Sequence, residues 1–340
     1  MTAKAFITGV AGLSLSEDEK AFLGNERPWG LILFARNCRD ADQIRELVAE
    51  FRDVVGDLSA PVLIDQEGGR VQRLRPPLAP IYPPGAVYGA LHAMDTEEGL
   101  AMARLGARLI AADLHALGID VDCLPVLDVP ATGSHDVIGD RAYGRDPKKI
   151  ATIGRAAAEG LLAGGVLPVI KHIPGHGRAM VDSHLDLPRV DTPLETLRET
   201  DFPPFKMLND MPLAMTAHVV YSALDTAPAT TSARIISEII RGEMGFDGCL
   251  MSDDLSMKAL GGDFGDRTRA ALAAGCDLVL HCNGDFEEMR AIAEATPELT
   301  GEASRRANAA LDRRRAPEAL DIEAARIAFA EQLEKATRIA

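Results

Sequence analysis

The sequence predicts an α/β protein built as a (β/α)8 barrel of the TIM type, in a single domain that spans residues 1–340. Two observations lead to this prediction. Short apolar runs rich in Val, Ile and Leu alternate about eight times with longer stretches of helical periodicity, which close with glycine. The apolar runs are continuous rather than strictly alternating, which is typical of parallel strands covered on both faces.

Each apolar run is predicted to form one strand of the barrel. The predicted strands are residues 5–10, 30–36, 61–66, 119–129, 166–173, 213–220, 248–255 and 277–282. The predicted helices include residues 41–55, 96–118, 147–165, 232–245 and 266–275. Residues 41–55 show the amphipathic pattern well, because Ile44, Leu47 and Phe51 fall on one face. The alanine-rich, charged tail over about 300–340 is predicted to be helical and to pack on the barrel.

A doubly wound open sheet is the alternative architecture. Such sheets usually carry a G-x-G-x-x-G turn after the first strand, and the corresponding stretch here reads TGVAGLSLS. No linker or low-complexity tract interrupts the chain, so we expect one catalytic barrel domain.

Composition and charge restrict the class of protein. The chain has 340 residues, of which 47% are hydrophobic, and a net charge of −15, which disfavours nucleic acid and anionic membranes as partners. Gly9 and Gly12 interrupt the first apolar stretch, which favours a first strand over a signal peptide, and no apolar run is long enough to span a bilayer. We expect a cytoplasmic monomer, although the sequence itself leaves the oligomeric state open.

The cysteines agree with a reducing compartment. Their number is odd, and no two form a CxxC pair, so we expect reduced and mostly buried thiols. They are Cys38, Cys123, Cys249, Cys276 and Cys282.

Polar residues occur where most of the predicted strands end. They are Asp65, Asp128, Lys171, His172, His218, Asp253, Asp254, His281 and Asn283. In a (β/α)8 barrel the active site lies at the carboxyl ends of the strands. A single aspartate at a strand end often only caps the next helix. Several charged groups at one rim instead favour a functional site.

The stretch KHIPGHGRAMVDSH over residues 171–184 is the most unusual, because it holds three of the eight histidines. His172 and His176 have the i, i+4 spacing of a helical zinc pair, but Pro174 and Gly175 disfavour a helix between them. A metal site on a loop, with Asp182 or His184 as a ligand, remains an alternative. We expect no metal.

A proton-transfer function fits the same stretch better. Asp182 and His184 share a face in an extended segment, so the carboxylate can orient the imidazole and raise its basicity. A hydrogen bond that only stabilises the loop would leave the same pattern. Asp253 and Asp254 point to opposite faces of a strand, so one should face the site, and the sequence does not say which.

Taken together, the motifs resemble glycoside hydrolase family 3, specifically its single-domain bacterial β-N-acetylhexosaminidases of the cell-wall-recycling type. The matching stretches are IDQEGGRVQRL (64–74), PVLDV (125–129), IGDRAYGRDP (138–147), KHIPGHG (171–177), DSH (182–184), TAHVVYSALD (216–225) and GFDGCLMSDDLSM (245–257). Ile173 stands where the family commonly has phenylalanine.

The resemblance implies a retaining exo-β-N-acetylglucosaminidase that acts on muropeptides without a cofactor. It assigns Asp253 as the nucleophile, His184 as the general acid/base and Asp182 as the residue that orients His184. It also implies that sugar is bound by Asp65, Arg73, Arg141, Lys171 and His172. Two alternatives remain open: a β-N-acetylglucosaminide phosphorylase with the same Asp/His pair, and a non-catalytic sugar-binding barrel.

Overall fold

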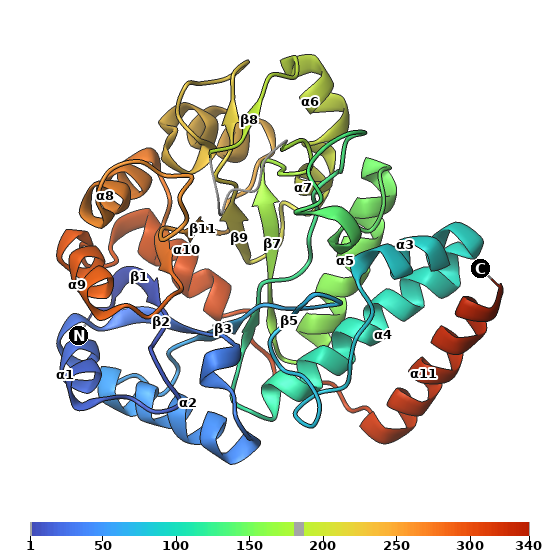
Figure 1. Cartoon of the computed structure of the whole chain (residues 1–340), viewed down its shortest axis with the longest axis horizontal. Coiled ribbons are helices and arrows are strands. Elements are labelled where there is room, and N and C mark those ends of the chain that lie inside the picture. The colour runs from blue at the N-terminus through green and yellow to red at the C-terminus, as the bar shows by residue number, and fades with distance from the viewer. Residues whose placement is uncertain (1, 180–186, 340) are drawn as a thin grey trace.

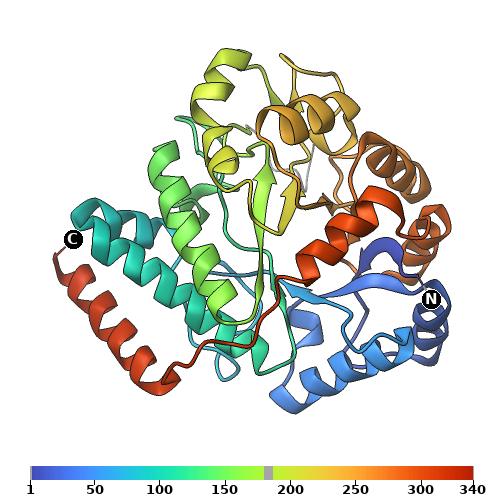
Figure 2. The ribbon, with the colours of Figure 1, turned by 180° about the vertical axis from the view of Figure 1, so that it is seen from behind.

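The computed structural model of the protein describes residues 2–179 and 187–339. Within these residues, eight parallel strands close into a barrel in the order β1-β12-β11-β9-β7-β6-β3-β2. Helices surround the barrel, as Figure 1 shows from one side and Figure 2 from the other. The predicted (β/α)8 barrel is confirmed, and the open doubly wound sheet is excluded.

Every barrel strand overlaps one of the predicted apolar segments. The strands are β1 (Lys4–Thr8), β2 (Pro28–Leu33), β3 (Val62–Ile64), β6 (Val121–Asp122), β7 (Leu167–Ile173), β9 (Leu213–Thr216), β11 (Cys249–Asp254) and β12 (Leu278–His281). Two short pairs lie outside the barrel: the hairpin β4 (Gln66–Gly68) with β5 (Val71–Gln72), and β8 (Arg189–Val190) with β10 (Val220–Tyr221).

The helices lie between the strands. They are α1 (Glu17–Glu26), α2 (Ala41–Val55), α3 (Gly85–Met94), α4 (Thr96–His115), α5 (Pro147–Ala163), α6 (Leu194–Thr200), α7 (Pro203–Met207), α8 (Phe264–Ala274), α9 (Phe286–Ala295), α10 (Gly301–Leu311) and α11 (Ile322–Ile339). Short 3₁₀ turns form η1 (Ala35–Asn37), η2 (Gly139–Arg141) and η3 (Ala229–Thr231), and a π-helical segment forms η4 (Ile235–Glu243). Residues 232–245, predicted as a helix, therefore contain η4.

Helix α2 illustrates how the local sequence sets the ends of an element. Asp40 precedes it in extended backbone, and its carboxylate accepts the amide of Gln43, which caps the first turn. Gly56 ends it in the left-handed region at φ 69°, where glycine carries no Cβ penalty. The helix has the predicted bounds because both signals are local.

The buried side chains form two main layers. Successive strand residues point to opposite faces, so Ile7 points into the barrel while Phe6 packs beneath the helices. The barrel interior is a separate cluster that also contains Ile32 and Leu63. Residues of α10, among them Ala307, join this interior cluster, so this helix covers the end of the barrel opposite the strands' carboxyl ends.

Strand β6 is much shorter than its predicted segment, residues 119–129. Pro125 has no N–H to donate to a ladder, so regular pairing stops before it. The chain nevertheless continues beside β7, because Leu127 N donates to Lys171 O at 2.7 Å and Lys171 N donates to Pro125 O at 3.1 Å. This irregular continuation brings Asp128 to the rim of the barrel.

The tail packs on the barrel as predicted. Helix α11 lies against α4 (Figures 1 and 2), where Arg326 forms an ion pair with Asp113 and Phe329 packs edge-on against Tyr82 with ring centroids 6.4 Å apart. Over the described part of the chain, none of the helices has both the length and the apolarity that a membrane span requires.

The β4–β5 hairpin follows β3 directly and folds over the rim. Gly68 adopts φ 100°, and a Cβ there would lie 2.4 Å from the carbonyl oxygen of Pro83. Only glycine fits this close approach without strain. The turn places Glu67 and Arg73 next to Asp65, which follows the last residue of β3.

Candidate active site

A cavity of about 420 Å³ opens at the carboxyl ends of the barrel strands. All six predicted site residues within the described chain line it: Asp65, Arg73, Arg141, Lys171, His172 and Asp253. Its apolar wall includes Phe34, Ile138, Met215 and Met257. A polar pocket of this size at this end of a barrel is typical of a small-molecule enzyme site.

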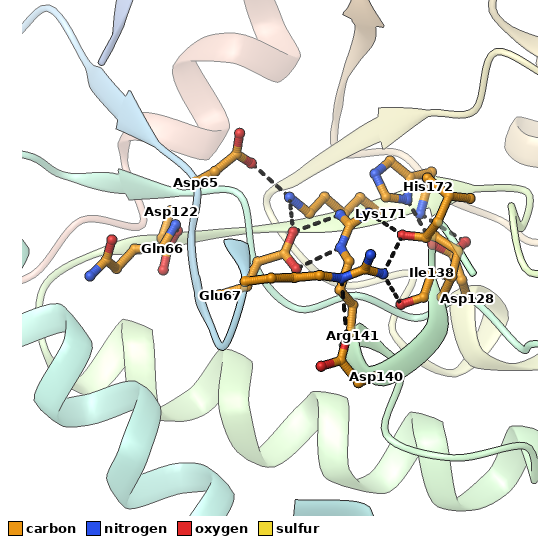
Figure 3. Close-up of polar contacts among 12 residues, drawn as sticks. Asp65, Gln66, Glu67, Asp122, Asp128, Ile138, Asp140, Arg141, Lys171 and His172 are labelled. Carbon is orange, nitrogen blue, oxygen red and sulfur yellow. Dashed lines mark hydrogen bonds and ion pairs between the residues drawn. The ribbon is translucent and has the colours of Figure 1, made fainter. Parts of the chain in front are cut away.

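Five charged residues form a continuous chain of ion pairs on one side of the cavity. The order is Arg73–Asp65–Lys171–Glu67–Arg141, and Figure 3 shows the part from Asp65 to Arg141. Lys171 Nζ lies 2.7 Å from both Asp65 Oδ1 and Glu67 Oε1. Arg73 Nη2 donates to Asp65 Oδ2 at 2.9 Å, and Arg141 donates Nε and Nη2 to the two oxygens of Glu67 at 2.8 and 2.7 Å.

These contacts favour the charged forms of Asp65, Glu67 and Lys171. Burial alone would raise the pKa of the Asp65 carboxyl, but the charges of Lys171 and Arg73 outweigh it and hold that pKa well below its usual value. The pKa of Glu67 is lowered for the same reason, with Arg141 as its strongest partner. Burial would lower the pKa of Lys171, yet Asp65 and Glu67 raise it above its usual value.

Asp122 lies beneath this chain of charges, and its pKa is shifted in the opposite direction to the pKa values of Asp65 and Glu67. Its Oδ1 accepts the amide of Gln66 at 2.9 Å, whereas Oδ2 is buried and has no hydrogen-bond partner among the described residues. Burial raises the pKa of Asp122 well above its usual value, because no cation in the described part of the chain contacts it closely enough to offset the loss of water.

Asp128 holds His172, at the end of β7, and His176, which follows that strand. Its Oδ2 lies 2.7 Å from His172 Nδ1, and its Oδ1 accepts the amides of His172 at 3.2 Å and His176 at 2.6 Å. The charge of His172 outweighs burial and lowers the pKa of Asp128 to about 2, so the carboxylate is ionised. An ionised Asp128 fixes the proton of His172 on Nδ1 and leaves Nε2 for a ligand. Burial and the neighbouring His172 lower the pKa of His176 to about 4, so that ring is neutral at neutral pH.

The two adjacent aspartates at the end of β11 have different surroundings. Asp254 is engaged in local structure, because its carboxylate accepts Ser256 N at 3.0 Å, Ser256 Oγ at 2.6 Å and Cys282 N at 3.1 Å. Among the described residues, the Asp253 carboxylate accepts one hydrogen bond, from Asp254 N at 2.8 Å. Burial opposes ionisation of Asp253, but His218 and His172 more than offset it, so its pKa lies below the usual value. Asp253 is thus an ionised carboxylate in the cavity that the described residues leave largely unengaged.

The other strand-end histidines lie behind the cavity wall. His218 Nε2 lies 3.0 Å from the carbonyl oxygen of Asp254, and Nδ1 lies 2.7 Å from Thr230 Oγ1. Because a carbonyl only accepts, Nε2 carries the proton and the ring braces the backbone that follows Asp253. His281 Nε2 lies 3.0 Å from Glu288 Oε2, on α9 outside the barrel.

Glu67 and Asp128 were missed as site residues, although both touch predicted site residues. Glu67 could have been found from its spacing, because Asp65 and Glu67 are two apart in extended backbone and so share a face. Asp128 was recognised as a strand-end aspartate, but its contact with His172 joins residues 44 apart in the chain, which no local pattern records.

Asp182 and His184 lie outside the described residues, so the structure does not place the predicted acid/base pair. Within residues 2–179 and 187–339, no three His, Cys, Asp or Glu side chains converge as metal ligands would. The metal alternative included Asp182 or His184, and it therefore stays untested.

Fold and site together define a (β/α)8-barrel enzyme with a charged small-molecule pocket. Residues 7–313 match the family model described as the glycosyl hydrolase family 3 N terminal domain. A β-hexosaminidase of Alkalilimnicola ehrlichii is 41% identical over 282 residues, which cover 81% of this chain and 79% of the relative. The chain belongs to glycosyl hydrolase family 3.

Solved structures agree with this assignment. NagZ from Neisseria gonorrhoeae, in a crystal structure with a zinc ion, is 30% identical with a TM-score of 0.87, and 98% of each chain is covered. A family 3 β-N-acetylglucosaminidase from Paenibacillus has a TM-score of 0.80 at 31% identity, and the match covers 97% of this chain and 61% of that one. Within the family the chain groups with the NagZ-type β-hexosaminidases, so it is a glycoside hydrolase.

Proposed function

We propose that this protein is a retaining exo-β-N-acetylglucosaminidase. It removes a terminal β-linked N-acetylglucosamine from peptidoglycan-derived muropeptides in the cytoplasm, as part of cell-wall recycling. The observation that carries the proposal is the ionised Asp253 carboxylate, which accepts one hydrogen bond among residues 2–179 and 187–339 and lies in a cavity with charged hydrogen-bonding groups. The names of the relatives, β-hexosaminidase and β-N-acetylglucosaminidase, support the sugar.

In the first step, Asp253 attacks the anomeric carbon and the glycosidic bond breaks. The leaving oxygen takes a proton from His184, and an ester forms between the sugar and Asp253. In the second step, water attacks the same carbon, His184 takes its proton, and the ester breaks. Two displacements return the anomeric carbon to its original configuration. Asp182 and His184 are outside the described residues and take these roles from the family resemblance.

The paired charges would bind the non-reducing sugar. The ionised Asp65 accepts hydrogen bonds from sugar hydroxyls, while Lys171, Arg73 and Arg141 donate to hydroxyl or acetamide oxygens. His172 presents Nε2 because Asp128 holds its Nδ1. Since these groups are already paired and oriented, little side-chain entropy is lost when the sugar binds.

The thiols support a reducing compartment. All five cysteines, each within the described residues, are free, and four of them are buried. No two are joined, as expected for a protein kept reduced.

Turnover and stereochemistry test the proposal. The protein should hydrolyse p-nitrophenyl β-N-acetylglucosaminide, and proton NMR should show the β-anomer as the first sugar released. A fluorosugar inactivator should leave one glycosyl group on Asp253, detected by peptide mass spectrometry. Release of the α-anomer, or a label on another residue, would contradict the mechanism.

A further inference from the structure

Glu67 contacts two of the predicted sugar-binding cations without reaching the cavity itself. Its side chain is 4% exposed, and it is absent from the cavity wall that Asp65, Lys171 and Arg141 help to form. It lines instead a void of about 10 Å³ behind Arg141, next to Tyr88 and Tyr143. Any effect of Glu67 on a bound sugar must therefore pass through the residues it holds.

We propose that Glu67 is a positioning residue that fixes the guanidinium plane of Arg141 for sugar binding. The inference rests on the proposed function, because that function makes Arg141 a sugar ligand. Glu67 accepts from Nε and Nη2 of Arg141 with two parallel hydrogen bonds of 2.8 and 2.7 Å, as Figure 3 shows. Two parallel bonds fix both the position and the plane of a guanidinium, which a single bond does not.

Arg141 depends on Glu67 more than Lys171 does. Lys171 also pairs with Asp65 at 2.7 Å, so it keeps one carboxylate if Glu67 is neutralised. Among the described residues, the other hydrogen bond of Arg141 is from Nη1 to the carbonyl oxygen of Val137, and it is long at 3.3 Å. The remaining N–H groups on Nη1 and Nη2 are the ones that a sugar can use.

The balance of charges in this group also indicates that Arg141 depends on Glu67. The linked group holds three cations and two carboxylates, and loss of Glu67 leaves three cations facing Asp65 alone. Lys171 would then repel the loosened Arg141, so the guanidinium would shift away from its place at the cavity wall.

A double-mutant cycle tests the inference on four proteins: wild type, Glu67→Gln, Arg141→Gln and the double variant. Glutamine keeps one oxygen for Lys171 Nζ and Arg141 Nη2, but its NH₂ group opposes Arg141 Nε, so the paired hydrogen bond that fixes the guanidinium plane is lost. We expect each single variant to raise KM for p-nitrophenyl β-N-acetylglucosaminide roughly tenfold or more, because a charge-assisted hydrogen bond is lost. We expect kcat to stay within about threefold, since the lost binding is shared by the substrate and transition state. The double variant should match Arg141→Gln within about threefold, because both changes remove the same interaction.

Active-site titration with the fluorosugar corrects each rate for the folded fraction. A merely structural Glu67 would lower that fraction and leave KM unchanged. Additive losses in the double variant, or an unchanged KM in Glu67→Gln, would overturn the inference. If Glu67→Gln fails to fold, the double variant is compared with Arg141→Gln alone, because the double variant loses one charge of each sign. An equal KM in the two variants supports the inference. A further rise of KM in the double variant overturns it.

Glu159→Gln is the matched control, because it breaks an exposed Glu–Arg pair with Arg104 far from the cavity and should change neither constant. A crystal structure of Glu67→Gln gives a readout that is independent of activity. Displacement of the Arg141 guanidinium in Glu67→Gln supports the inference, and an unmoved guanidinium overturns it. An inactive wild type would count against the proposed function, whereas an active wild type with an unchanged Glu67→Gln variant would count against Glu67 alone.

Discussion

Asp128 Oδ2 lies 2.7 Å from His172 Nδ1, and the other oxygen of the same carboxylate accepts the amide of His176. One buried carboxylate thus fixes both the ring of His172 and the backbone at His176. Its own ionisation is secured by the imidazole it holds.

Asp128→Asn should weaken catalysis through His172. Asparagine keeps one oxygen for the two backbone amides, so its NH₂ group faces His172 Nδ1 and no longer stabilises a proton there. A loss of about 2 kcal/mol is expected for a hydrogen bond to a charged group, or roughly thirtyfold in kcat/KM. Steady-state kinetics on the aryl glycoside measures it. Asp42→Asn, which breaks an exposed pair with Arg45, serves as the control. A change of less than threefold in Asp128→Asn would contradict the role of this contact.

Asp253 and Asp254 should respond differently to the same substitution. Asp253→Asn removes the nucleophile and should lower kcat by roughly 10⁴-fold or more. Asp254→Asn should mainly lower stability, by about 1–2 kcal/mol, because asparagine keeps one oxygen for the amides of Ser256 and Cys282 but replaces the oxygen that accepts Ser256 Oγ with an NH₂ group. Kinetics and urea unfolding on both variants separate the two effects. A larger loss of kcat in Asp254→Asn than in Asp253→Asn would reverse the assignment.

Stability should fall on acidification in two stages. The pKa of His176 is about 4 in the folded protein, against about 6.5 unfolded. Its neutral form therefore stabilises the fold fully above about pH 6.5, and roughly 3 kcal/mol is lost as the pH falls through 4. Asp128, with a folded pKa of about 2, contributes stability above about pH 4 that is lost below it.

Urea unfolding between pH 8 and 3 measures this dependence. His176→Gln should flatten the curve between pH 6.5 and 4 and leave the steeper fall below pH 4. An unchanged slope between pH 6.5 and 4 in this variant would show that other groups cause the loss.

The thiols should be almost unreactive in the native protein. Cys38 is half-buried, and burial raises its pKa to about 12, so little thiolate forms at pH 8. The other four are buried. A disulfide reagent such as DTNB should react with at most one thiol slowly, and with five after denaturation. Fast reaction of two or more native thiols would show an opening of the barrel that the structure does not contain.

Removal of metal should leave turnover unchanged, because the proposed chemistry needs a carboxylate and an imidazole. Dialysis against EDTA, with the metal content checked by mass spectrometry, provides the measurement. Activity lost with EDTA and regained with zinc would favour the alternative in which His172 or His176 binds a metal.

The sequence alone determined the barrel and the ends of helices with clear caps, such as α2. Apolar runs record which segments are buried on both faces, and caps such as Asp40 and Gly56 act within a few residues, so they can be read without the fold. The motifs also indicated six residues that the structure brings to one cavity, including Asp65, Lys171 and Asp253.

Only the tertiary structure decided how the charges are paired. Glu67 meets Lys171, Asp128 meets His172, and Asp254 meets Cys282 across 104, 44 and 28 residues respectively. Closure of the barrel sets these contacts, because it brings the ends of distant strands to one rim. Periodicity reports the burial of a residue but not the partner it meets there, and that partner determines which carboxylate is left to react.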